Sequence, residues 1–238
     1  MKPSLLLILL ATLLSGCATL NGPADPRDPL ERYNRAMHNF NEGFDRRIFR
    51  PLAEGYVKVT PSPVRRSIGN FFSNLNDIWV MTNNLLQGKP GQSASDLSRV
   101  IWNTTVGIGG LFDVASHLEL PKHNEDFGQT LGVWGVGSGP YLVLPLLGPS
   151  TVRDTAGRAV QWHYDPLGYW VSFESQVFLT GLNLLDSRAS LLRTTRLIDA
   201  AALDSYSFTR DAYLQRREFL IHDGHPPQEE FDPFADDF

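Results

Sequence analysis

Residues 127–152 form one continuous stretch without a single Asp, Glu, Lys, Arg or His. By length such a stretch could cross a bilayer as an α-helix, which needs about 20 apolar residues. Its composition argues against that helix, because glycine and proline are both strongly unfavourable inside helices. The glycines stand at 128, 132, 135, 137, 139 and 148, and the prolines at 140, 145 and 149. We therefore expect an uncharged, non-helical insert, and the rest of the chain must indicate which environment it faces.

The N-terminus has the features of a secretion signal that ends in a cysteine. Lys2 precedes an apolar segment, residues 5–14, that is too short for a transmembrane helix and typical of a signal peptide. Residues 14–17 read Leu-Ser-Gly-Cys and resemble the bacterial lipobox, whose cysteine is acylated. We expect residues 1–16 to be a lipoprotein signal peptide. The alternative is an ordinary signal peptide that happens to contain a cysteine.

Cys17 is the only cysteine of the chain, so it has no disulfide partner and is free for another use. After cleavage it would be the first residue and carry a diacylglycerol and an N-acyl chain, and two or more chains anchor a protein stably. No other cofactor is expected. Ala18 follows, where an aspartate would favour the inner membrane, so the address resembles that of the outer membrane. Residues 17–28, with two prolines and two aspartates, are predicted to be a lipidated tether.

The C-terminal residues 223–238 contain no Lys or Arg and are predicted to form a disordered acidic tail. Their acidic residues stand at 223, 229, 230, 232, 236 and 237. Without this tail and Lys2 the chain has 20 basic and 20 acidic residues, so its body is neutral. A neutral body lacks the basic surface that nucleic-acid binding requires, and we expect no nucleic-acid partner.

The body, residues 29–222, is predicted to be one helical domain. Asp28-Pro29-Leu30-Glu31 has the pattern of a helix start, and apolar residues then recur at intervals of three and four as far as Pro51, which should stop or kink the helix. Further helices are expected at about 62–87, 93–106, 111–118, 150–163, 166–185, 187–203 and 205–221. The one alternating, strand-like pattern lies at 141–144.

Several helices are apolar on more than one face, as around Phe71-Phe72 and Ile78-Trp79. None contains 18 uninterrupted apolar residues, so none is predicted to span a bilayer. Helices that lie along a membrane face explain both observations. A well-packed soluble core with exposed aromatic residues is the alternative, and the predicted anchor at Cys17 favours the membrane.

No pattern typical of an enzyme is complete. Ser138 lacks the first glycine of a hydrolase G-x-S-x-G elbow, and a trio of Ser138, Asp154 and His163 is of a kind that arises by chance. No pair of histidines has zinc-binding spacing, and His117, His123 and Asp126 are expected to be an ordinary loop cluster. We therefore predict no catalytic residues and no metal site.

Six segments, taken together and in order, resemble the MlaA (VacJ) lipoprotein family. They read DPLERYNRAMHNFN (28–41), NFFSNLNDI (70–78), NNLLQGK (83–89), NTTVGIGGLFDVA (103–115), DFGQTLGVWGVGSGPYLVLPLLGPSTVRD (126–154) and SYSFTRDAYLQRREFL (205–220). The fifth segment is the most specific, because so many glycines and prolines at fixed places in one apolar run rarely arise twice.

The resemblance implies an all-α fold, a ring of amphipathic helices that lies in one membrane leaflet around a central amphipathic channel with a glycine- and proline-rich hairpin beside it. It implies an outer-membrane lipoprotein of a Gram-negative bacterium, on the periplasmic side. Such a protein takes mislocalised phospholipid out of the outer leaflet and passes it to the soluble periplasmic carrier MlaC. Its usual partner is an outer-membrane porin trimer. The alternatives are a structural lipoprotein that only associates with a porin, and a lipid hydrolase.

By position in the family, the hairpin is expected at Leu131 to Leu147, with a flexible centre that we hypothesise to gate the channel. Its expected residues are Leu131, Gly132, Gly135, Gly137, Gly139, Pro140, Tyr141 and Leu144, of which Gly135, Gly137 and Gly139 form the centre. Asn39, Phe40 and Asn41 match a family segment near the channel and are candidates to face it. The alternative for these polar residues is the solvated face of the first helix. Arg153-Asp154 is expected to be a structural ion pair or helix cap.

Overall fold

A computed structural model describes residues 25–165, 171–201 and 204–227. The described chain is helical apart from one two-stranded antiparallel hairpin, which confirms the all-α class with a hairpin insert. The elements are α2 (Glu31–Phe44), the π-helical turn η1 (Asp45–Phe49), α3 (Arg50–Val59), α4 (Ser62–Leu86), α5 (Pro90–Thr105), α6 (Val114–His117), α7 (Phe127–Val133), β1 (Tyr141–Leu144), β2 (Gly148–Thr151), α8 (Val152–His163), α10 (Phe173–Ala201) and α11 (Ser205–Ile221).

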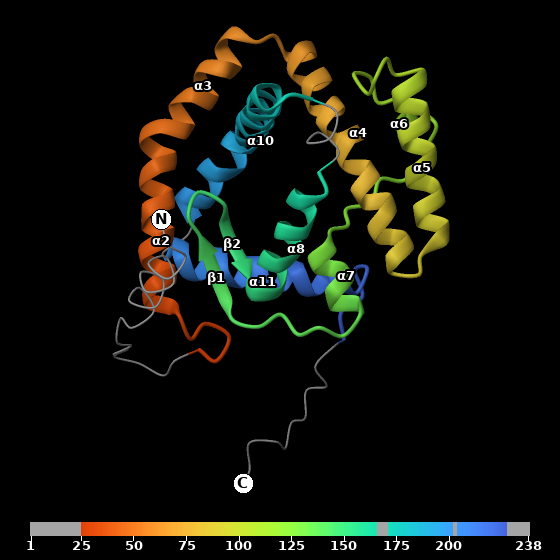
Figure 1. The fold of residues 1–238 in the computed structure, drawn as a ribbon. Helices are drawn as coiled ribbons and strands as arrows, with labels where there is room; N and C mark the ends of the chain where they lie inside the picture. Colours follow the sequence, from red (N-terminus) through yellow and green to blue (C-terminus); the bar gives the residue numbers. More distant parts are fainter. Residues whose placement is uncertain (1–24, 166–170, 202–203, 228–238) are drawn as a thin grey trace.

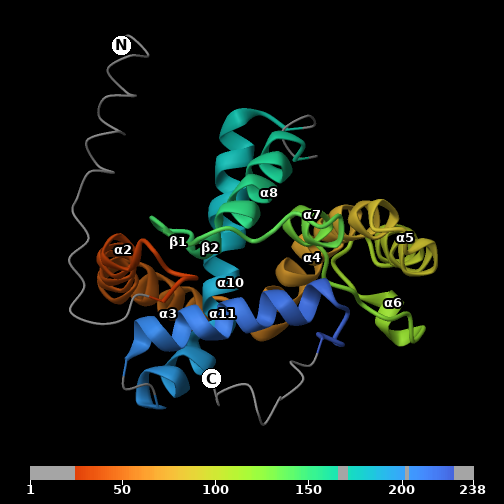
Figure 2. The same ribbon diagram turned by 90° about the horizontal axis from the view of Figure 1, so that it is seen from below.

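Helices α2, α3 and α4 follow one another as an arch, and α11 crosses the open end of that arch (Figure 1). The hairpin and α8 lie inside this outline, whereas α5 packs on the outer side of α4 and α6 packs on α5. Seen from below, the arch and α11 lie in one layer, while α10 passes through the layer and α8 projects from it (Figure 2). This outline is compatible with the expected ring.

The first long helix does not stop at Pro51, as one reading of the sequence predicted. Residues 45–49 form a π turn, and the helix continues directly as α3, with Pro51 in its first turn. Proline has no N–H to donate, and its ring clashes with the carbonyl four residues back. A π turn changes the hydrogen-bond pattern at that place, so the chain curves there instead of ending.

The start of that helix differs from the prediction. Helix α2 begins at Glu31 with Leu30 at the N-cap position, and the side chain of Asp28 does not cap it. Asp28 is completely buried, accepts hydrogen bonds from Asn34 and from the Tyr206 hydroxyl, and forms an ion pair with Arg210. A fully buried carboxylate needs such partners, so Asp28 serves the contact with α11 and not the helix end.

Helix α10 is continuous where two helices, at 166–185 and 187–203, were expected. No glycine or proline interrupts α10 between Gly181 and its end at Ala201, and the polar residues near 186 are used in tertiary contacts instead of a cap. Asp186 accepts a hydrogen bond from the Tyr56 hydroxyl at 2.8 Å, and Arg188 binds both carboxylate oxygens of Asp45 in η1. Residues 166–170, where the first of the two was to begin, lie outside the described residues.

The interior is unusually polar and the exterior unusually apolar. Among the described residues, 19 polar or charged residues are buried against seven hydrophobic ones, while 32 large hydrophobic residues are exposed. Arg99, for example, is buried between Asp77 and Asp113. No helix in the described part of the chain is both long and apolar enough to cross a bilayer. Water-soluble domains bury their large apolar residues, so this inverted distribution favours a protein whose outer surface contacts lipid.

Candidate functional site: a clamped hairpin inside the helical frame

The hairpin itself is formed by Tyr141–Leu144 and Gly148–Thr151, with Tyr141 opposite Thr151 and Leu144 opposite Gly148. Its first strand coincides with the strand pattern predicted at 141–144. Pro145, Leu146 and Leu147 form the turn, where Leu146 has a φ of 62° and Gly148 a φ of 78°. The hairpin therefore lies further along the chain than the expected 131–147.

Leu131 and Gly132 lie in α7 and not in the hairpin. The Asp126 carboxylate caps this helix by accepting a hydrogen bond from the Gln129 N–H at 2.9 Å. At its other end Gly135 has a φ of 87° and donates to the carbonyl of Gly132, and the next residue donates to that of Leu131. This is a Schellman motif, in which glycine is favoured because of its positive φ. Gly135 thus ends a helix, which corrects its predicted place at a hairpin centre.

Gly137 and Gly139 lie in the connection between α7 and β1. Around it the carbonyl of Ser138 accepts the Arg153 N–H and that of Pro140 accepts the Val152 N–H, so the connection is attached to the start of α8. Gly139 has a φ of 64°, and a Cβ there would meet Val152 at 3.2 Å. Gly137 has no atom within 4 Å of a Cβ position and no positive φ. Of the three central glycines, only Gly137 lies in open space without a conformational reason for glycine.

Two asparagines of α2 hold the outer edge of β1. Asn34 donates to the Tyr141 carbonyl at 3.0 Å and accepts the Val143 N–H at 2.8 Å. Asn41 donates to the Leu144 carbonyl at 2.9 Å and accepts the Leu146 N–H at 2.7 Å. A side-chain amide has one donor end and one acceptor end, as a backbone amide does, so each asparagine replaces part of a third strand. The free edge of the hairpin is thereby satisfied by a helix.

The spacing explains why both asparagines reach the strand, since seven residues are about two helical turns and bring them to one face. Asn34 was missed from the sequence, although the pair at 34 and 41 was the available signal. Of the candidates to face a channel, Asn41 contacts the hairpin. Asn39 is exposed and has no polar contact in the described part of the chain, and Phe40 is half exposed.

The inner face of β1 packs on α11. Tyr141, Val143 and Tyr206 form a buried apolar cluster, and Met37, Tyr213 and Leu214 pack around it. The rings of Tyr141 and Tyr206 meet edge to face with centroids 6.3 Å apart. Burial raises the pKa of both phenols, so they stay neutral at physiological pH. The hairpin is therefore held on both sides, by amides of α2 and by aromatic rings of α11.

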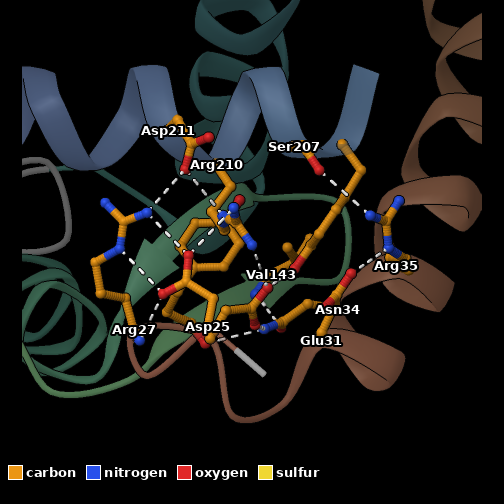
Figure 3. A network of polar contacts seen from close by, with 12 residues as sticks. Asp25, Arg27, Glu31, Asn34, Arg35, Val143, Ser207, Arg210 and Asp211 are labelled. Carbon is orange, nitrogen blue, oxygen red and sulfur yellow. Dashed lines mark hydrogen bonds and ion pairs between the residues drawn. The ribbon is translucent and has the colours of Figure 1, made fainter. Parts of the chain in front are cut away.

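A network of ion pairs joins the chain before α2 to α11 (Figure 3). Arg27 and Arg210 both bind Asp25, and hydrogen bonds from Arg27 lower the pKa of the Asp25 carboxyl to about 2. The carbonyl of Arg27 accepts the Tyr141 N–H at 2.9 Å, which extends the contacts to β1. The last residues of the predicted tether 17–28 thus belong to the folded body. Cys17 and residues 1–16 lie outside the described residues.

The far end of the body is also fastened. Asp223, the first residue of the predicted tail, forms an ion pair with Lys89 at 2.6 Å, and residues 223–227 are part of the described structure. Residues 228–238 lie outside it. The Arg153-Asp154 ion pair is present at 3.3 Å, and the Asp154 N–H binds the hydroxyl of Thr151, which caps α8. Both contacts are structural, as predicted for that pair.

The described residues contain no cluster of three or more His, Cys, Asp or Glu side chains that could hold a metal ion. His123 contacts Asp96, and Asp126 binds Arg217, so the two are engaged with different partners. Asp154, the acid of the imagined hydrolase trio, accepts hydrogen bonds from Tyr213 and Arg217. His123, Asp126 and Asp154 therefore each have a structural partner within the protein.

Known proteins share this sequence pattern and this fold. The family model for the MlaA lipoprotein matches residues 26–220. The chain is 39% identical to the intermembrane phospholipid transport system lipoprotein MlaA of Escherichia coli (strain K12), covering 94% of this chain and 90% of that protein. It is 34% identical to the lipoprotein of the same name from Haemophilus influenzae, covering 94% and 92%.

A solved structure from work on the "structural basis for maintenance of bacterial outer membrane lipid asymmetry" superimposes with a TM-score of 0.73 at 37% identity, and covers 82% of this chain and 98% of that one. The family model's match to residues 26–220 includes the arch, the hairpin and all of α11 except its last residue. The resemblance stated from six sequence segments is thus confirmed over the whole body, and the chain belongs to the MlaA lipoprotein family.

Proposed function

We propose that this protein is a lipoprotein of the outer membrane of a Gram-negative bacterium that takes mislocalised phospholipid out of the outer leaflet and thereby maintains lipid asymmetry. The relatives named for intermembrane phospholipid transport support this function. The observation that carries it is the inverted distribution of side chains, polar within and apolar without. A phospholipid has a charged head and two apolar tails, so a protein that moves it between leaflets needs both kinds of surface in contact with a bilayer.

In this proposal Cys17 carries the lipid anchor, and the helical body lies in the inner leaflet. A path through the helical frame, bordered by the hairpin, leads lipid toward the periplasm, where the carrier MlaC receives it. A porin trimer holds the protein at the outer membrane. The protein moves lipid without making or breaking covalent bonds, so it needs no catalytic group.

The experiment is a deletion of the gene followed by measurement of outer-leaflet phosphatidylethanolamine with an amine-reactive reagent that does not cross the membrane. We expect the labelled lipid to rise in the deletion strain and to return to its original level when the full chain is supplied. A Cys17→Ala variant, which cannot be acylated, should not restore it. Unchanged outer-leaflet lipid together with altered extraction of a porin would favour a structural lipoprotein instead. Release of lysophospholipid by the purified protein would favour a hydrolase.

We further infer that the hairpin gates the lipid path, with the connection at Gly137 as the place where it moves. In the described structure the hairpin is bound to α2 by only four hydrogen bonds, all with the side-chain amides of Asn34 and Asn41. Gly137 lies in open space, so the connection there has room to move. Bulky residues in place of Gly137 and Gly139 would restrict that connection, so the amount of phospholipid in the outer leaflet should differ from the wild-type amount. A wild-type level in such a variant, at equal protein abundance, would refute the gate.

A further inference from the structure

A partly enclosed polar pocket of about 120 Å³ lies behind the hairpin, between α7, α8 and α11. Its lining residues are Asp126, Asp154, Arg158, Gln161, Tyr213 and Arg217. The volume is several times the roughly 30 Å³ that one water molecule occupies in the liquid. The pocket is therefore large enough for a small polar group, though not for an acyl chain.

Two helices supply most of the lining through regular spacing. Asp154, Arg158 and Gln161 follow one another at intervals of four and three along α8, which places them on one face. Tyr213 and Arg217 are four residues apart on α11. Gly157 lets α8 approach α7 closely at this place, since a Cβ on it would lie 2.5 Å from the backbone nitrogen of Gly128. The pocket is thus built on helices and not on loops.

Its carboxylates are already occupied by protein donors. Arg217 binds Asp126 with both terminal nitrogens, at 2.5 and 3.0 Å, and one of these nitrogens also binds Asp154 at 2.8 Å. The Tyr213 hydroxyl donates to the other oxygen of Asp154 at 2.7 Å. The acidic residues consequently have little remaining need for a cation inside the pocket.

Several N–H donors remain unused. The Nε of Arg217 is buried without a hydrogen-bond partner, in a side chain that is only 10% exposed. Arg158 has no carboxylate partner among the described residues, and contacts the carbonyls of Leu147 and Pro149 at 3.3 Å each. The Gln161 amide has no hydrogen bond in the described part of the chain. A surplus of donors around two guanidinium groups calls for an anion with several oxygens.

We propose that this pocket binds a phosphate group, and specifically the phosphodiester of a phospholipid headgroup. Arg158 and Gln161 donate to the phosphate oxygens, and the guanidinium charge of Arg217 lines the same pocket. With Arg153 beside Asp154, the charged residues here total three arginines and two aspartates, and one phosphodiester neutralises the excess.

The pocket is in direct contact with the hairpin, which relates the two sites. Arg158 touches carbonyls at the hairpin turn and at β2, and the ring of Tyr213 packs against that of Tyr141, with centroids 6.2 Å apart. A headgroup held there lies next to the segment that borders the lipid path, where it would pause during transfer. This role rests on the proposed function, whereas the binding itself does not.

The test is isothermal titration calorimetry of the full-length, acylated protein in phosphate-free detergent. The two water-soluble probes are glycerophosphoethanolamine and inorganic phosphate. We expect saturable binding of glycerophosphoethanolamine and weaker binding of inorganic phosphate. Because a hydrogen bond to a charged group contributes about 1.5–3 kcal/mol, Arg158→Gln and Gln161→Leu should each weaken binding about tenfold or more. Gln161→Leu is the more informative variant, since Gln161 supports no other described group.

Arg216→Gln is the matched control, because Arg216 is the exposed neighbour of Arg217 on α11 and has no polar contact in the described structure. It should bind the probe as the wild type does, and Arg158→Lys should retain part of the affinity. No saturable binding, or equal loss with Arg216→Gln, overturns the site. Inorganic phosphate that binds as tightly as glycerophosphoethanolamine overturns its assignment to a lipid headgroup.

The outcome is separable from the transport function. If deletion of the gene raises outer-leaflet phospholipid but the probe does not bind, the pocket proposal fails while the transport proposal stands. If the probe binds and the deletion leaves the lipid unchanged, the reverse holds.

Discussion

The Asn34 amide should be the most sensitive single polar contact of the hairpin. Its side chain is completely buried and makes three hydrogen bonds, to the Asp28 carboxylate at 2.8 Å, to the Tyr141 carbonyl at 3.0 Å and from the Val143 N–H at 2.8 Å. Asn34→Ala removes all three and leaves two backbone groups and a carboxylate short of a partner in the interior. No water can reach them without opening the contact between α2 and β1.

The magnitude follows from the type of each bond. A neutral hydrogen bond contributes about 0.5–1.5 kcal/mol and one to a charged group about 1.5–3 kcal/mol. Two of the first kind and one of the second give about 2.5–6 kcal/mol for Asn34→Ala. Since whole domains are stable by about 5–15 kcal/mol, this is a large fraction of the free energy of unfolding.

The assay is chemical unfolding of the detergent-solubilised protein, combined with amide hydrogen exchange of the peptide that covers residues 141–151. Asn34→Ala should lower the free energy of unfolding by the amount above and speed up exchange at Val143. Asn39→Ala is the control, because Asn39 is exposed on the same helix and has no polar contact in the described structure. A loss below about 0.5 kcal/mol for Asn34→Ala, equal to that of the control, would show that the clamp does not hold the hairpin.

Four further substitutions, one of them a control, test neighbouring contacts. Asn41→Ala should speed up amide exchange at residues 144–146 with only a small change in the melting temperature, because this amide is half buried and its two bonds are neutral. Gly157→Ala should destabilise by about 1–3 kcal/mol in chemical unfolding, since its Cβ would overlap the backbone of Gly128, whereas Gly137→Ala, in open space, should be tolerated. Arg217→Met should cost about 1.5–3 kcal/mol, because it removes an ion pair from the buried Asp154, which keeps Arg153 and Tyr213, and from the partly exposed Asp126. Burial raises the pKa of Asp126, but the hydrogen bond and charge of Arg217 together lower it below 3.8, so the wild type keeps this stabilisation above pH 3.8 and loses it as the pH falls further. Without Arg217 the burial that raises this pKa is no longer offset by its charge and hydrogen bond, so Arg217→Met should lose less stability on acidification than the wild type. Parallel losses in the two proteins between pH 7 and 2 would contradict the pairing.

Elements whose ends are determined by local chemistry were predicted closely. Helix α11 has the predicted bounds, with Asp204 as a capping residue, and α4 starts at Ser62-Pro63 and is followed by Gly88 with a φ of 75°. The strand β1 also has its predicted bounds. Caps, prolines and positive φ values act within a few residues, so a single sequence contains the information.

The hairpin was misplaced because glycine has two uses that look alike in sequence. Gly135 was interpreted as a flexible centre but serves as the C-terminal stop of α7. What decides between them is the close packing of α7 on α8, which depends on Gly157 and Gly128, residues 29 positions apart. A short helix such as α7 is stabilised chiefly by tertiary contact, which no local pattern reports.

The sequence by itself determined the chemical character of this protein. It indicated a neutral helical body too polar to span a bilayer, an uncharged glycine- and proline-rich insert and the family, all of which are properties of residue type and order, and the acylation of Cys17 stays a prediction. Only the tertiary structure decided which side chains act together. Asn34 reaches Tyr141 across 107 positions and Arg217 reaches Asp126 across 91, and both pairs depend on how α2, α7 and α11 pack. A buried polar group takes whichever partner the fold brings within about 3 Å, and that choice is made by the packing of whole helices.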